Sequence, residues 1–364
     1  MPRRDLHLKP FDESTRDKLE LYREYLREWL PVFIHASYID RLQIFDFFAG
    51  PGIDISGTPG SPLITCDEIR NALSQHGKQH PKIKVYFNEC NAAKFKQLSE
   101  CIDEQKKSLP QVDFITMRND FHSSFEQWQS LMQGKTANLL FLDQSGVQQI
   151  TESVFKVIVR LPKTDMIFFI SSALANRFKK KPEIRKNLPI RDEDLGLMNR
   201  SNVHRLLANA YPRWIPEGLK YYIGSFSIEK GANVYGLVFG SGHPLGIDKF
   251  LQVAWKHGGD ANFDIDDDGI DPKQPSLFSE FDKPKKIKVF EKALEKEILD
   301  GHLKTNKDIY IFALQNGMLA SHAKDALNLL VKNEKLPKQK FHVLYGAWKK
   351  PDAETIMHFN GVGK

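Results

Sequence analysis

Four short apolar segments of this chain each end beside an acidic residue, and this recurrence restricts the fold more than any other feature. The first segment, residues 43–52, reads QIFDFFAGPG; its aromatic and β-branched residues predict a buried strand that stops at a glycine turn. Further strands are predicted at 84–88, 112–117 and 138–142. In a parallel sheet the carboxyl ends of the strands meet at one edge, where ligands bind in open α/β folds. That edge is therefore expected to gather the acidic residues Asp46, Glu89, Asp120 and Asp143.

The remaining periodicity completes the predicted sheet. A fifth strand is expected at 166–170, and a hairpin at 220–228 and 233–239 closes the set. A helix capped by Ser14 or Thr15 runs to Pro31 or slightly beyond, and we interpret it as a packing helix that covers the sheet. Five parallel strands and a hairpin make a seven-stranded, mostly parallel sheet.

The glycine turn after the first strand is the first candidate binding element. Gly50 and Gly52 let backbone N–H groups approach a ligand, because no Cβ stands in the way. Asp46 is a carboxylate in an apolar run, which suggests a ligand contact. The turn is only a GxG, so a strand that simply ends in a turn is the competing interpretation. Residues 53–62 then form a Gly- and Pro-rich loop before a helix that starts at Ser61-Pro62; this loop is either an anion site or a lid.

The next strand ends offer groups suited to a nucleoside. Glu89 is placed to accept hydrogen bonds from ribose hydroxyls, or alternatively to cap the next helix. Asp120 can accept from the exocyclic amine of adenine while Phe121 stacks on the ring, although a turn of the Asx type explains Asp120 equally well. Asp143 adds a further carboxylate at the fourth strand end.

Composition narrows the class of protein. With 364 residues, 41% hydrophobic and 27% charged, the chain is expected to be a soluble protein with one large domain and a smaller one. Apolar runs stay well short of the roughly 20 residues that span a bilayer. The sequence shows no secretory signal, and its three cysteines do not have the spacing of metal ligands or of a disulfide pair. We therefore expect a reduced, cytoplasmic protein without a metal site.

Basic residues provide a hint of a polyanionic partner. The net charge is +6, and residues 177–186 read RFKKKPEIRK just beyond the fifth strand. A solvated loop is one interpretation; contacts to nucleic-acid phosphates are the other. The candidate phosphate contacts are Arg177, Lys179, Lys180 and Lys181.

The C-terminal third is expected to form a separate unit. Residues 261–288 are a polar linker; its DxDxDG segment has Pro275 where a calcium loop needs a glutamate, so we reject an EF-hand. Residues 289–350 predict three helices and a strand at 340–345, as in a winged helix-turn-helix that binds DNA or protein. Its third helix would present His322, Lys324, Asn328 and Lys332. Residues 1–260 form the main domain.

The segment FDFFAGPGIDISGTPGSPL at 45–63, the NE after the second strand, LFLDQSG at the fourth and the C-terminal unit together resemble the three-Cys-motif partner (TcmP) protein family. The resemblance implies a Rossmann-like domain of class I S-adenosylmethionine (SAM) dependent methyltransferases, acting beside a radical-SAM-like three-Cys-motif protein in a bacterial system. It also implies that SAM is the cofactor, bound by Asp46, Phe48, Gly50, Gly52, Glu89, Asp120 and Phe121.

One departure from that pattern leaves two hypotheses. Amino-methyltransferases of bases have a proline and an aromatic residue after the acidic residue of the fourth strand, whereas this chain has Asp143-Gln144-Ser145. A cysteine nucleophile is also missing there, which disfavours cytosine C5 chemistry. The chain is either a methyltransferase of nucleic acid, with Asp143 orienting the nucleophile, or an inactive partner subunit that binds DNA or protein.

Overall fold

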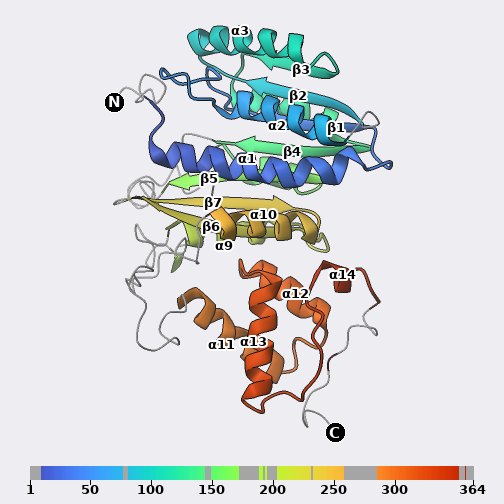
Figure 1. Cartoon of the computed structure of the whole chain (residues 1–364). Coiled ribbons are helices and arrows are strands. Elements are labelled where there is room, and N and C mark those ends of the chain that lie inside the picture. The colour runs from blue at the N-terminus through green and yellow to red at the C-terminus, as the bar shows by residue number, and fades with distance from the viewer. Residues whose placement is uncertain are drawn as a thin grey trace. The chain divides into compact units, whose positions relative to one another are not determined.

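The computed structural model describes residues 10–76, 81–143, 149–171, 188–191, 193–194, 203–230, 233–257, 285–351 and 357. The chain folds into two compact units, Met1–Lys249 and Phe250–Lys364. Residues 258–284, which hold most of the predicted linker, lie outside the described part. Figure 1 shows a sheet with flanking helices in the first unit and a group of helices in the second.

A seven-stranded sheet forms the centre of the first unit, in the order β3-β2-β1-β4-β5-β7-β6. Strands β1 to β5 pair in parallel, while β7 is antiparallel to both β5 and β6. This confirms the predicted mostly parallel α/β sheet. The strands are β1 (Arg41–Asp46), β2 (Lys82–Asn88), β3 (Val112–Met117), β4 (Thr136–Leu142), β5 (Thr164–Ser171), β6 (Tyr222–Lys230) and β7 (Asn233–Ser241).

Every predicted strand of the sheet is found, but β2, β4 and β5 begin earlier than expected because their first residues are polar. Lys82 lies beside Asp113 of the neighbouring strand, with Nζ and Oδ2 3.2 Å apart. Asn138 Nδ2 donates to the hydroxyl groups of Thr136 at 3.2 Å and Thr164 at 2.9 Å. Lys82 and Asn138 thus pair with polar side chains of the neighbouring strands, which an apolar pattern cannot reveal.

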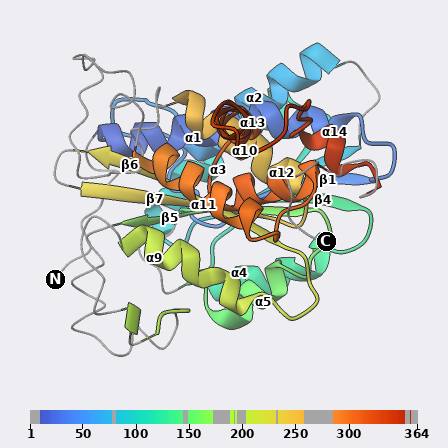
Figure 2. The same ribbon diagram turned by 90° about the horizontal axis from the view of Figure 1, so that it is seen from below.

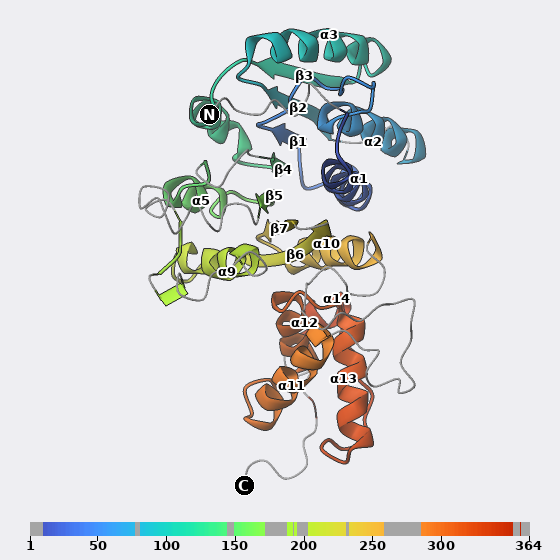
Figure 3. The same cartoon turned by 90° about the vertical axis from the view of Figure 1, so that its left-hand side faces the viewer.

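Helices cover both faces of the sheet. Viewed from below and from the side, one face carries α1 (Glu13–Ile34), α2 (Ser61–His76) and α10 (Pro244–His257), and the other carries α4 (Phe121–Trp128), α5 (Glu152–Ile158) and α9 (Val203–Ala210) (Figures 2 and 3). Helix α3 (Ala92–Ser108) packs against β3 and α2. Short 3-10 turns are η2 (Gln129–Met132) and η4 (Tyr211–Trp214). Parallel strands covered on both faces read as nearly continuous apolar runs, which explains why the sequence revealed them.

Helix α1 begins differently from the prediction. Asp12 is its N-cap, accepting a hydrogen bond from Thr15 N–H at 2.8 Å, so neither Ser14 nor Thr15 takes that place. The helix continues through Pro31 to Ile34. Aspartate is among the best N-cap residues, and it starts the helix slightly earlier than the apolar spacing indicated.

The second unit contains α11 (Lys285–Leu299), α12 (Asn306–Gln315), α13 (Ala320–Lys332) and α14 (Tyr345–Trp348). Thr305 caps α12 in a capping box with Asp308. The strand predicted at 340–345 is wrong, because the backbone there is irregular and leads into α14. His342 N–H instead donates to Asn306 Oδ1 at 2.8 Å, so a side chain takes the place of a strand partner.

Candidate functional site

The glycine turn is tied to the end of the second strand. Gly50 N–H donates to Glu89 Oε2 at 3.1 Å, and Asn91 N–H donates to Glu89 Oε1 at 2.7 Å. Gly50 and Gly52 have φ of 66° and 92°, a region that favours glycine. Glu89 is buried, yet each carboxylate oxygen has a second lone pair for a further donor. The structure thus brings Gly50 of the turn and Glu89 together at the end of β2.

Asp46 lies at the end of β1 and is fully buried. Its carboxylate accepts hydrogen bonds from Phe48 N–H at 3.1 Å and from the Ser61 hydroxyl at 2.6 Å. Burial, with smaller contributions from the negative charges of Asp143 and Glu89, raises the pKa of Asp46 to about 7 although these hydrogen bonds lower it. In this structure Asp46 holds the start of α2 against the end of β1. Its contact with a ligand stays a prediction.

Asp54 organises the loop between the turn and α2. It accepts hydrogen bonds from the backbone N–H groups of Phe11, Ser56 and Thr58, each at 2.8 Å, and from the Ser56 hydroxyl at 2.7 Å. Burial acts to raise the pKa of Asp54, but the hydrogen bonds outweigh it and the pKa is lowered. Gly60 N–H also donates to Gly52 O at 2.8 Å. Asp54 was not among the predicted site residues, although an aspartate three positions before a glycine, as in Asp54-Ile55-Ser56-Gly57, is typical of a turn.

The residues predicted to hold adenine have structural contacts of their own. Asp120 is the N-cap of α4; it accepts from Ser123 N–H at 3.0 Å and the Ser123 hydroxyl at 2.7 Å, and these bonds lower its pKa. Phe121 is buried, and its ring stacks on Phe48 with centroids 5.5 Å apart. Phe48 is only half-buried and is the more open of the two rings. Contacts of these residues with adenine stay predictions.

Asp143 follows β4, and its carboxylate forms an ion pair with Lys18, which was not among the predicted site residues. Lys18 of α1 places Nζ 2.8 Å from each carboxylate oxygen. The same Nζ lies 4.8 Å from the centroid of the Phe169 ring. Only 13% of the Lys18 side chain and 26% of the Asp143 side chain is exposed. The neighbouring Gln144 and Ser145 lie outside the described residues.

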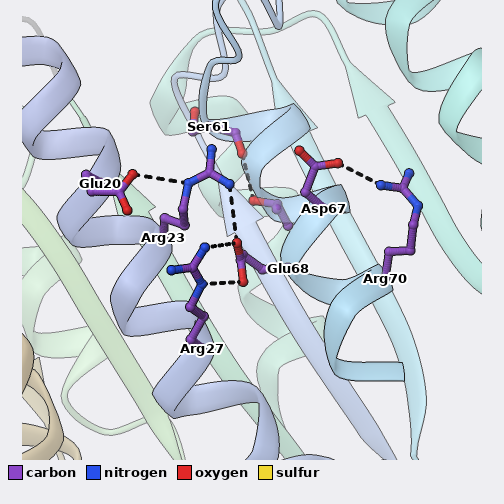
Figure 4. A network of polar contacts seen from close by, with 8 residues as sticks. Glu20, Arg23, Arg27, Ser61, Asp67, Glu68 and Arg70 are labelled. Atoms are coloured by element: carbon purple, nitrogen blue, oxygen red, sulfur yellow. Dashed lines mark hydrogen bonds and ion pairs between the residues drawn. The ribbon is translucent and has the colours of Figure 1, made fainter. Parts of the chain in front are cut away.

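A second ion cluster fixes α1 against α2 (Figure 4). Glu68 of α2 is 2% exposed and accepts from Arg27 Nε at 2.9 Å and from Arg23 Nη1 at 3.3 Å. The hydrogen bond from Arg27 to Glu68 raises the pKa of Arg27, although burial opposes it. Because α1 carries Lys18 and α2 begins at Ser61, this cluster helps to hold both site residues in position.

The third helix of the second unit presents a polar face. Lys324, Asn328 and Lys332 are exposed at a spacing of four residues, so they share one side of α13. His322, which was predicted to lie with them, instead packs its ring 4.3 Å from that of Trp255, and its Nδ1 accepts from Leu319 N–H at 3.3 Å.

The basic run with Arg177, Lys179, Lys180 and Lys181 lies outside the described residues. Among the residues that the structure describes, no group of three or more His, Cys, Asp or Glu side chains could hold a metal ion. Within the same part of the chain, no helix is long and apolar enough to cross a membrane.

Comparison with known proteins identifies the C-terminal unit. Residues 264–338 match a family model described as a GMT-like wHTH domain. The second unit is a winged helix-turn-helix domain. Curated proteins yielded no match to the chain.

Solved structures of methyltransferases are similar at low identity. A SAM-dependent methyltransferase from Agrobacterium tumefaciens is 8% identical with a TM-score of 0.32, and the match covers 62% of each chain, less than two thirds of that protein. A putative O-methyltransferase from Klebsiella pneumoniae is 11% identical, with a TM-score of 0.34 over 64% of this chain and 91% of that one. The small RNA methyltransferase HEN1 is 11% identical, with a TM-score of 0.33 over 65% and 27% of the two chains. Membership in the three-Cys-motif partner family stays a prediction.

Proposed function

We propose that this chain is a SAM-dependent methyltransferase that acts on nucleic acid. The observation that carries the proposal is the contact between Glu89 and the N–H of Gly50, 3.1 Å long, at the carboxyl edge of the sheet. It sets a carboxylate beside a turn in which Gly50 and Gly52 have positive φ and bring no Cβ that would stand between the backbone and a ligand. Such a pair suits a ligand that has an anionic end and a ribose.

The chemistry of the residues at this edge suggests a different binding role for each of them. The turn at Gly50 and Gly52 would hold the methionine part of SAM, and the remaining lone pairs of Glu89 would accept from the ribose hydroxyls. Asp46, Phe48, Asp120 and Phe121 complete the proposed pocket. SAM, when bound, supplies an electrophilic methyl group on its sulfonium sulfur. The protein contributes mainly alignment, with Asp143 orienting the acceptor.

Nucleic acid is the substrate class that the second unit favours. The exposed face of α13 carries Lys324, Asn328 and Lys332, side chains suited to phosphates and base edges. The net charge of +6 and the basic run from Arg177 to Lys181 agree with this choice. Reaction within a reduced cytoplasm fits the free thiols Cys66, Cys90 and Cys101.

An inactive partner subunit is the alternative function. It is favoured by Gln144 and Ser145, which replace the proline and aromatic residue of amino-methyltransferases, and by the ion pair that engages Asp143. In that case the fold would serve a complex with the radical-SAM-like three-Cys-motif protein. Co-purification of the two proteins from one host tests this pairing.

Transfer of radiolabelled methyl groups from SAM to RNA and DNA separates the two functions. We expect label in nucleic acid with the wild type and with Asp113→Ala, a control acid near the amino end of β3 and away from the carboxyl edge of the sheet. Asp143→Ala should lose the transfer. A folded wild type that binds SAM but labels no nucleic acid would favour the partner subunit.

A further inference from the structure

The contacts of Lys18 define a small polar subsite at the ends of two neighbouring strands. Asp143 follows β4 and Phe169 belongs to β5, which pair in parallel. Together they surround one nitrogen: both carboxylate oxygens lie 2.8 Å from Lys18 Nζ, and the aromatic ring centroid lies 4.8 Å away. A carboxylate beside an aromatic face is the chemistry that recognises a nitrogen carrying several hydrogens.

Anchoring of α1 does not depend on this ion pair. Arg23 and Arg27 hold the helix to Glu68 of α2. Further along the helix, Tyr25 and Trp29 each donate to Asp165 of β5 at 3.0 Å. A lysine has a flexible four-carbon stem, so its ammonium group can leave Asp143 while the helix stays in place.

The ion pair of Lys18 and Asp143 differs from an ordinary surface ion pair in its burial and in its position. Lys249 also forms an ion pair with a carboxylate of α1, its Nζ lying 2.7 Å from Glu28 Oε2. The Lys249 side chain is 31% exposed and the Glu28 side chain 42%. The Lys18 pair is more deeply buried and lies at the strand ends where ligands bind in such sheets. Without a cation, Asp143 would add an uncompensated charge near Asp46, whose pKa its negative charge already helps to raise.

We propose that Asp143 and Phe169 form a subsite for an amino nitrogen, and that Lys18 occupies it as an internal ligand until an external nitrogen replaces it. The subsite stands on the contacts alone. The assignment of this subsite to the methyl acceptor rests on the proposed function. With that assignment, the atom that accepts the methyl group is a nitrogen rather than a hydroxyl oxygen or a ring carbon. Asp143, which as a carboxylate only accepts hydrogen bonds, would orient that nitrogen through its N–H groups.

Chemical rescue of a lysine variant tests the subsite with the full-length protein. Lys18→Ala removes the internal nitrogen, and ethylammonium chloride is the probe that returns one. We expect ethylammonium to raise the melting temperature of Lys18→Ala above that seen with equal sodium chloride. Ethanol, which has a similar size and no ammonium group, should not do so. The wild type and the control Lys249→Ala should respond to ethylammonium no more than to sodium chloride.

The double variant Lys18→Ala with Asp143→Asn identifies the carboxylate. Loss of the ethylammonium effect in this variant supports the proposal. The proposal is overturned if ethylammonium and sodium chloride act alike on Lys18→Ala, or if the effect persists without the Asp143 carboxylate. Should Lys18→Ala not fold, Lys18→Ser, which also removes the nitrogen and leaves room for the probe, carries the same comparison. SAM binding is measured separately, so failure of the proposed function leaves the rescue result interpretable.

Discussion

The carboxylate of Glu89 accepts a hydrogen bond from the backbone N–H of Gly50 at 3.1 Å, which joins the end of β2 to the turn after β1. Ala49 N–H also donates to Asn88 O at 3.0 Å, directly before these two residues. The turn is therefore fixed by its neighbouring strand before any ligand arrives. A preformed turn reduces the ordering that binding would otherwise require.

Alanine substitutions at Gly52 and Gly57 distinguish an effect on backbone strain from an effect on ligand binding. Gly52 and Gly57 both have positive φ, 92° and 80°, so alanine at either position should cost about 1–2 kcal/mol of unfolding free energy. Only Gly52→Ala puts a methyl group at the candidate binding turn, and we expect it alone to weaken SAM binding, by about tenfold or more. Chemical denaturation and calorimetric titration provide the two measurements. Equal SAM affinities for both variants would contradict this role of Gly52.

Removal of Glu68 should destabilise the first unit. Glu68→Ala leaves Arg23 and Arg27 without their buried carboxylate, and we expect a loss of roughly 2–4 kcal/mol in unfolding free energy. Asp67→Ala is the matched control, because Asp67 pairs with Arg70 on the surface of the same helix, where a pair contributes about 0–1 kcal/mol (Figure 4). Urea denaturation compares the two, and similar losses would argue against the role of the cluster.

Stability should depend on pH through Asp165. Burial raises the pKa of this carboxyl from 3.8 to about 6, although hydrogen bonds from Ser241, Tyr25 and Trp29 oppose the rise. The folded state therefore binds this proton more tightly than the unfolded state, and the contribution of Asp165 to stability is lost as pH rises from about 4 to about 6. The contribution is on the order of 3 kcal/mol.

The variant Asp165→Asn has no proton to release, so its unfolding free energy should lack this part of the pH dependence. Denaturation at several pH values between 4 and 7 gives the difference between the two proteins. Asp46 titrates in both and cancels from that difference. Parallel curves for wild type and variant would show that Asp165 does not titrate as described.

The sheet could be predicted from the sequence because its strands are apolar runs at regular intervals, as in residues 138–142. The place of Glu89 at the end of β2 could also be predicted, since parallel strands bring their ends to one edge, but its hydrogen bond with Gly50 could not. The Lys18 contact with Asp143 could not be predicted, because the two residues lie 125 positions apart and their helix reads as a packing helix. The error at 340–345 has a similar cause, since an extended apolar segment looks like a strand even when side chains satisfy its backbone.

Binding of nucleic acid by the winged helix-turn-helix domain should depend on the exposed face of α13. Lys324→Ala combined with Lys332→Ala removes two candidate phosphate contacts, so the slope of log affinity against log salt should fall by about 2. The pair Lys292→Ala and Lys296→Ala removes the same charge from exposed positions of α11 and serves as the control. Fluorescence anisotropy with duplex DNA at several salt concentrations measures both slopes. An equal effect of the two pairs would indicate attraction to overall charge rather than docking of α13.

Calorimetric titration with SAM and S-adenosylhomocysteine tests the central claim most directly. The wild type should bind both ligands, and Glu89→Ala should lose this binding because the ribose and the Gly50 N–H lose their shared carboxylate. Glu126→Ala, on an exposed position of α4, should bind like the wild type. A folded wild type that binds neither ligand, or a Glu89→Ala variant with unchanged affinity, would contradict a SAM site at this edge of the sheet.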